Sequence, residues 1–142
     1  IHEMIPTAKL VNAKEIIHWQ DDTQEWQGMP VKEIGTHFGV DRVLYIELLD
    51  YHTREPGSKN LMRGRIHAVA RVYETDTPGD KPVWEREIDV YWPKVAPVNS
   101  LQSSDVTVRR RVLEAFSDEL VGNFFDRREY EKSIREQEGQ SK

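Results

Sequence analysis

Two stretches of the sequence, 61–73 and 83–92, alternate between apolar and polar residues. A period of two residues is typical of antiparallel strands that bury one face of a sheet. The residues expected to face the core in the first stretch are Met62, Gly64, Ile66, Ala68, Ala70 and Val72. Pro78 and Gly79 separate the two stretches, and such turn residues predict a hairpin.

A third apolar stretch, 41–51, does not alternate. It places Val43 and Tyr45 on one face of a strand and also Leu44 and Ile46 on the other. Apolar residues on both faces are typical of strands buried in the interior of a sheet. The pattern therefore predicts a central position for this first strand.

Helical spacing appears at both ends of the chain. Asn12 followed by Glu15 has the spacing of a capping box and predicts a short helix over 13–20. Pro30 and Gly39 suit the start and the end of a second helix.

A long C-terminal helix is predicted over 105–135, with Ser104 as its N-cap. Its apolar stripe is expected to contain Val112, Leu113, Phe116, Leu120, Phe124 and Phe125. We therefore expect an α+β fold, a two-layer α/β sandwich. It has a mainly antiparallel sheet of at least three strands with helices packed on one face. A chain of 142 residues suits one domain, predicted over 1–135, and the charged residues 136–142 predict a disordered tail.

Composition and motifs exclude several kinds of chemistry. The net charge of −5 argues against a broad basic surface, so we predict no nucleic-acid partner. The absence of cysteine excludes disulfides, thiolate nucleophiles and cysteine-based zinc sites. The histidines show no metal-ligand spacing and the glycines form no phosphate loop. We therefore predict no metal, no cofactor and no catalytic residue, although a site formed between subunits stays open.

The outward positions of the predicted hairpin carry opposite charges. A basic row contains Arg63, Arg65, His67 and Arg71, and an acidic row contains Glu85, Glu87 and Asp89. The rows predict a cross-strand charge ladder, which keeps an exposed sheet face soluble. Alternatively, Arg63, Arg65 and Arg71 could bind a small acidic ligand, provided that their guanidinium groups are unpaired. Tyr91 and Trp92 end the third strand and are candidates for a protein contact, beside a simple packing role.

The chain resembles a recurring domain of bacterial envelope lipoproteins over about residues 30–128. The segments that carry the likeness are EIGTHFGVDRVLYIELLDY, RGRIHAVARVYETDTPGDKPVWEREIDVYWP and FSDELVGNFFDRREYE. It is similar to the domain shared by the curli-secretion lipoprotein, the lipoprotein activators of penicillin-binding proteins and the TolB N-terminal domain. The likeness is strongest to uncharacterised lipoproteins of planctomycete-like bacteria. These domains usually carry a further N-terminal strand and helix, for which no clear counterpart precedes Leu10.

The resemblance implies a non-catalytic periplasmic domain that acts through contacts with other envelope proteins. It also implies a lipidated cysteine and a linker upstream of Ile1, as the only attachment to the membrane. An apolar or aromatic patch is then expected at one edge or end of the sheet. A cytoplasmic location is the alternative.

Overall fold

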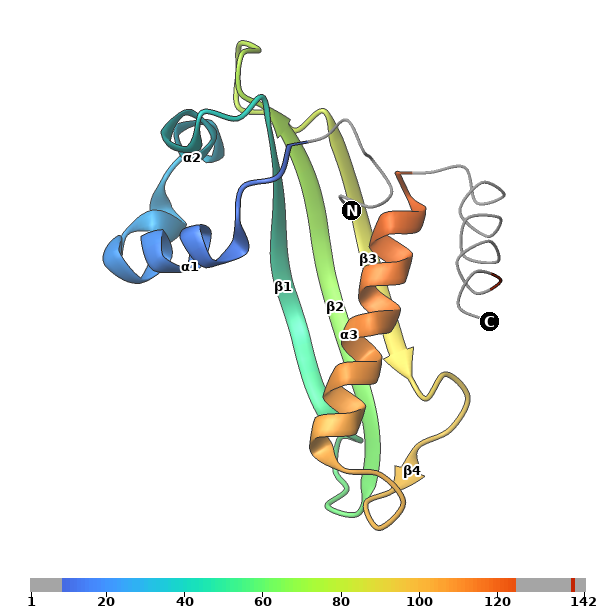
Figure 1. Cartoon of the computed structure of the whole chain (residues 1–142). Helices are drawn as coiled ribbons and strands as arrows, with labels where there is room; N and C mark the ends of the chain where they lie inside the picture. Colours follow the sequence, from blue (N-terminus) through green and yellow to red (C-terminus); the bar gives the residue numbers. More distant parts are fainter. Residues whose placement is uncertain (1–8, 125–138, 140–142) are drawn as a thin grey trace. The chain divides into compact units, whose positions relative to one another are not determined.

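A computed structural model describes residues 9–124 and 139 of the chain. The elements in order are α1 (Ala13–Asp22), η1 (Trp26–Gly28), α2 (Val31–Phe38), β1 (Arg42–Arg54), β2 (Leu61–Glu74), β3 (Trp84–Trp92), β4 (Val98–Asn99) and α3 (Asp105–Gly122). An antiparallel sheet with α3 packed on it confirms the predicted α+β fold (Figure 1).

The order of the long strands is β1-β2-β3, so β2 is the central strand. Beyond the end of β3, the two-residue strand β4 pairs antiparallel with β2 and places Val98 opposite Met62. The central position predicted for the first strand is wrong, because β1 has β2 as its only strand neighbour among the described residues. Its apolar residues on both faces therefore do not reflect burial between two strands.

The chain divides into two compact units. One consists of Ile1–Tyr45 and Arg71–Glu85, and the other consists of Ile46–Ala70 and Arg86–Lys142. Each of the three long strands crosses from one unit into the other. The single domain expected over 1–135 stays a prediction, and the tail predicted for 136–142 lies outside the described residues except for Gly139.

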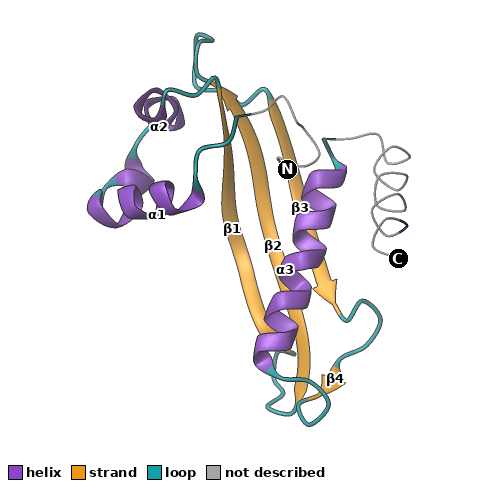
Figure 2. Ribbon diagram, viewed as in Figure 1, coloured by secondary structure: helices purple, strands orange, loops and turns teal. Residues whose placement is uncertain are grey.

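The helix–sheet core lies in the second unit, where α3 runs along the strands (Figure 2). The buried apolar side chains there are Met62, Ile66, Ala68, Ala70, Ile88, Val108, Val112, Phe116 and Leu120. Gly64 allows the close approach of α3, since a Cβ atom built on it would lie 2.8 Å from Cβ of Val112. The predicted inward face of β2 is confirmed from Met62 to Ala70, and Val72 is half-buried.

The buried side of α3 differs in part from the predicted stripe. Residues four positions apart, beginning at Val108, face the sheet, whereas Leu113 is exposed. The helix begins at its predicted cap, where the Ser104 hydroxyl accepts a hydrogen bond from the Thr107 N–H. It ends at Gly122, earlier than predicted, since Asn123 and Phe124 form a turn. The remaining predicted length, with Phe125, lies outside the described residues.

In the first unit, α1 and α2 pack through aromatic rings. The ring of Trp19 stacks on His37 and meets the edge of Phe38 at centroid distances of 5.2 and 5.3 Å. The predicted cap is confirmed, because the Asn12 side chain accepts a hydrogen bond from the Lys14 N–H. Gly39 ends α2 with a φ of 63°, a left-handed conformation that favours glycine.

One strand ends later than predicted, and two short elements were not predicted. Strand β1 continues to Arg54, beyond the stretch 41–51. The short elements η1 and β4 lie in segments for which the sequence predicted neither a helix nor a strand. Residues such as Gly28 and Pro97 are typical of turns, and they do not predict a single 3-10 turn or a strand of two residues.

The close packing at Gly64 can be tested by adding one methyl group. Gly64→Ala should lower the free energy of unfolding by about 1–3 kcal/mol, because the new Cβ would overlap Val112. Urea unfolding measures the change, and Gly28→Ala is the control, since a Cβ there meets nothing within 4 Å. A second change, Val112→Ala, should partly relieve the overlap in the double variant. Equal stability of Gly64→Ala and wild type would contradict the packing.

Candidate functional site

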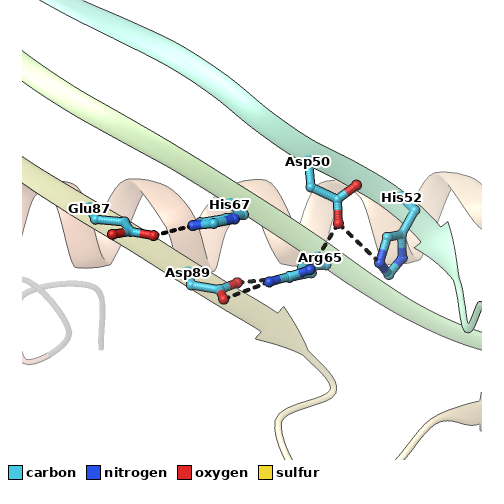
Figure 3. Close-up of polar contacts among 6 residues, drawn as sticks. All are labelled: Asp50, His52, Arg65, His67, Glu87 and Asp89. Atoms are coloured by element: carbon cyan, nitrogen blue, oxygen red, sulfur yellow. Dashed lines mark hydrogen bonds and ion pairs between the residues drawn. The ribbon is translucent and has the colours of Figure 1, made fainter.

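Charged side chains cover the face of the β-sheet opposite α3. They alternate along β2 with the buried residues that contact the helix. Arg65 is the centre of this open face and bridges two strands (Figure 3). It donates to both oxygens of Asp89 on β3, at 3.0 and 2.8 Å, and to Oδ2 of Asp50 on β1 at 3.0 Å. The ion pairs therefore tie all three long strands together on this face.

The other two arginines proposed for an acidic ligand are also engaged. Arg71 binds Glu85, and Arg63 donates to the backbone carbonyls of Pro93 and Lys94 at 3.1 and 2.7 Å. These contacts favour the structural interpretation of the basic row, because an anionic ligand would have to displace them.

Both histidines of the open face lie beside carboxylates. His67 pairs with Glu87 through Nε2. His52 Nε2 lies 3.7 Å from Asp50 Oδ2, and its Nδ1 is buried without a hydrogen-bond partner among the described residues. His52 therefore points one ring nitrogen toward a carboxylate and buries the other.

The charge environment fixes the ionisation of the central pair. The hydrogen bond from Arg65 lowers the pKa of the Asp89 carboxyl, and this bond outweighs the opposing effect of partial burial. The same bond with Asp89 raises the pKa of Arg65. Both groups therefore stay charged at neutral pH, and the pair acts as a permanent cross-strand link.

Tyr91 and Trp92, the predicted contact residues, are half-buried. The guanidinium carbons of Arg63 and Arg65 lie 4.5 and 5.3 Å from the centre of the Tyr91 ring. These cation–π contacts occupy the ring within the open face. Tyr91 therefore packs against two arginines of the open face, and the contact role predicted for Tyr91 and Trp92 stays a prediction.

Other binding features lie elsewhere or were not found. Among the described residues, no group of three or more histidine, aspartate or glutamate side chains could hold a metal ion. Within the same part of the chain, no helix combines the length and hydrophobicity needed to cross a bilayer. A shallow hollow of about 650 Å³ lies along α3, and the described residues that line it all belong to that helix. None of the predicted site residues lines this hollow.

The edge of β1 carries exposed apolar side chains, although a strand buried in the interior of the sheet was predicted here. The exposed fractions are 43% for Ile46, 58% for Leu48, 50% for Leu49 and 41% for Tyr51. The strand has 13 residues and contains neither lysine nor proline, which commonly protect an exposed edge. These residues form what we call the β1 edge, defined as Ile46–Tyr51.

The other edge of the three long strands is different. Strand β3 carries Glu85, Arg86, Glu87 and Asp89 among nine residues, so charge protects it from unwanted pairing. Strand β1 also carries the charged residues Glu47 and Asp50 within its edge, so the two edges differ in the exposed apolar side chains that lie beside these charges on β1. The sequence contains these apolar residues, but it does not show that they lie at an edge, because the strand order is not known from it.

Comparison with protein families, with curated proteins and with solved structures found no match to this chain.

The central ion pair predicts a specific dependence of stability on pH. Asp89→Asn should lower the free energy of unfolding at pH 7, because it removes the charged acceptor of Arg65. A depressed pKa in the folded state stabilises the protein above the pKa of the unfolded state, near 4. The difference between variant and wild type should therefore shrink as the pH falls from about 5 through the folded-state pKa.

Urea unfolding at a series of pH values measures this difference. Glu114→Gln is the control, since its pair with Arg111 at 3.5 Å is exposed on α3 and should contribute less than about 1 kcal/mol. A difference between Asp89→Asn and wild type that stays constant down to pH 2 would show that the carboxylate charge does not matter.

Proposed function

We propose that this chain is a non-catalytic, protein-binding domain of the bacterial cell envelope and that it contacts partner proteins through the β1 edge. The observation that carries the proposal is the edge of β1, where four large apolar or aromatic side chains are exposed on a strand whose only strand neighbour among the described residues is β2. A patch of this kind at a sheet edge is what the envelope-lipoprotein resemblance led us to expect. The proposed partners are other envelope proteins.

Physical reasons favour strand addition at this edge. No strand of the described part of the chain pairs with the outer edge of β1, where a partner strand could form backbone hydrogen bonds. The apolar side chains beside these groups would lose their contact with water on pairing, at a gain of about 25 cal/mol per Å². Backbone pairing supplies the affinity, and the side chains on both faces supply the selectivity.

The proposed location is the periplasm, with a lipid anchor on a cysteine upstream of Ile1. The resemblance to envelope lipoproteins supports this part of the proposal. A protein held at a membrane would meet its partners at a raised local concentration, which suits an edge of modest size.

Two alternatives have less support. A binding module for a small acidic ligand would need free guanidinium groups, whereas Arg63, Arg65 and Arg71 are engaged with carbonyls and carboxylates. An enzyme whose site forms between subunits would need a histidine–carboxylate pair in a cleft. The pairs of His52 and His67 lie instead on the open face of the sheet.

Site-specific photo-crosslinking tests the contact surface. A photoreactive residue at Leu48, placed in the full precursor in its natural host, should give a discrete covalent adduct with another protein. The matched control is the same residue at Leu113, which is 47% exposed on α3 and should give no such adduct. Equal adducts at both positions, or none at Leu48, would sink the proposal of a contact at the β1 edge.

Cell fractionation and mass spectrometry test the location separately. The mature natural protein should sediment with membranes and carry an acylated N-terminal cysteine that precedes Ile1 in the precursor. An unmodified N-terminus on a protein that stays in the cytoplasmic fraction would exclude the envelope assignment. That result would leave the contact at the β1 edge to be judged by crosslinking alone.

A further inference from the structure

We propose that one end of the sheet binds directly to the surface of a membrane that contains anionic phospholipids. We call this region the loop end and define it by residues 54–61 and 93–104. Its cationic side chains bind the lipid phosphates, and Val95 and Leu101 insert between the headgroups. The contact lies outside the β1 edge and is independent of a lipid anchor, so it goes beyond the proposed function.

The loop end consists of two segments that lie side by side at the same end of the second unit (Figure 1). Strand β4 pairs with the start of β2, and the Ser100 N–H donates to the Asn60 carbonyl at 2.8 Å. Arg63 donates to two backbone carbonyls at the start of the segment 93–104. These bonds hold the connection between β3 and α3 against the turn between β1 and β2. The two segments therefore present one surface.

Two apolar side chains of this surface are almost fully exposed. The exposed fractions are 93% for Val95 and 94% for Leu101, the highest among the large apolar side chains of the described residues. The turn at Leu101 is fixed by hydrogen bonds, because the Asn99 side chain accepts from the Leu101 N–H at 2.9 Å and the Asn99 carbonyl accepts from Gln102 at 2.8 Å. Packing among the described residues therefore does not account for either apolar side chain.

The charges beside these side chains are mostly positive. The loop end contains the exposed cations Arg54, Lys59 and Lys94 and a single, half-buried carboxylate, that of Glu55. No carboxylate of the described residues forms an ion pair with any of the three cations. The whole chain has a net charge of −5, so the loop end has the opposite sign. This charge favours an anionic partner.

The carboxylates nearest to the loop end are already paired. Asp105, which begins α3, pairs with Arg109 at 3.3 Å, and Arg65 holds two more carboxylates on the open face. Glu87 pairs with His67, which lies six residues along β2 from the loop end, or about 20 Å. That distance is about twice the Debye length at 0.1 M salt. The acidic residues elsewhere therefore do not cancel the positive charge of the loop end.

The arrangement of the apolar side chains favours a membrane over an acidic protein. Val95 and Leu101 belong to two separate turns of the connection 93–104. A protein partner would need a matching cavity for each side chain, whereas lipid headgroups move apart around any inserted group. Lysine and arginine also suit this interface, because their aliphatic stems lie along apolar groups while the charge reaches the phosphates.

The number of groups sets the strength of the contact. Each cation near an anionic membrane strengthens binding by about fivefold, and the loop end has two more cations than carboxylates. One fatty acyl chain gives a binding constant of about 10⁴ M⁻¹. We expect about 10³ M⁻¹ for the loop end, which inserts less apolar surface than an acyl chain does. A contact of this strength would orient a protein that a lipid anchor already holds at the membrane.

Vesicle co-sedimentation tests the contact. The chain contains no cysteine and therefore carries no lipid on cysteine that could bind instead. About half of it should sediment at about 1 mM lipid with phosphatidylcholine vesicles that contain about 30% phosphatidylglycerol, in 50 mM salt. Binding should be at least about tenfold weaker to pure phosphatidylcholine and in 0.5 M salt. Equal binding to both kinds of vesicle, or none up to about 10 mM lipid, would overturn the proposal.

A charge-reversal variant tests whether the loop end is the surface that binds. Lys59→Glu combined with Lys94→Glu should weaken binding to the anionic vesicles by at least about tenfold. The matched control combines Lys9→Glu with Lys14→Glu, which changes the net charge equally at two exposed positions of the first unit. Equal losses in the two double variants would show that net charge alone decides binding, and the proposed surface would then be wrong.

An environment-sensitive fluorophore tests insertion. Leu101→Cys labelled with a nitrobenzoxadiazole group should brighten by about twofold or more on the anionic vesicles, because the label leaves water. The same label on Leu113→Cys, in α3, should not change, and Val95→Cys provides a second position in the loop end. Binding that leaves both loop-end labels unchanged would overturn the proposal, since cations without insertion suit an acidic protein equally well. Each variant is first checked for an unchanged unfolding midpoint.

The outcomes separate this inference from the proposed function. If the vesicle experiments fail while crosslinking at Leu48 yields an adduct, the membrane contact is wrong and the contact at the β1 edge stands. If the vesicles bind through the loop end while crosslinking at Leu48 fails, the membrane contact stands without the β1 edge. An acylated N-terminus neither replaces nor predicts the vesicle result, because these experiments use the chain without a lipid.

Discussion

The close approach of α3 to β2 at Gly64 is the constraint on which the rest of the second unit depends. Val108 and Val112 occupy the space that a side chain at position 64 would fill. This contact lets the remaining buried residues of the helix reach the strand's inner face and form one apolar layer. Helix α3 covers one face of these strands, so other interactions must stabilise the opposite face.

Ion pairs meet that requirement on the open face. Arg65 forms ion pairs with carboxylates on both neighbouring strands, and these pairs link the strands on the open face. Individual exposed pairs contribute little, but a guanidinium held by two carboxylates also fixes the register of three strands. The charged face therefore helps to hold the strands together. The arginines that the sequence offered as contacts for an acidic ligand are instead engaged with groups of the protein itself.

The sequence predicts the parts of this fold that depend on local chemistry. Alternation identifies the inner face of β2, and the Asn12 and Ser104 caps mark the starts of two helices. The position of β1 could not be predicted, because apolar residues on both faces occur both in a buried central strand and in an outer strand with exposed apolar side chains. The bridge from Asp50 to Arg65 was missed for the same reason, since it requires knowing which strand lies beside β2. Leu113 follows Val112, which belongs to the buried stripe of α3. Which of these two neighbours is buried depends on the rotation of the helix about its axis, and only the packing of α3 on the sheet fixes that rotation.

The order of the strands along the chain gives the apolar β1 edge a consequence during protein synthesis. Strand β1 leaves the ribosome before β2, its neighbour in the sheet, and about 20 further residues must follow before β2 is complete. At about 5–20 residues per second, the nascent chain exposes both edges of β1 for about 1–4 s. The breakers between the strands, Pro56 and Gly57, keep the closing loop short, so the first hairpin can form as soon as its second half emerges. Rapid hairpin closure then protects one edge of β1 from aggregation during synthesis.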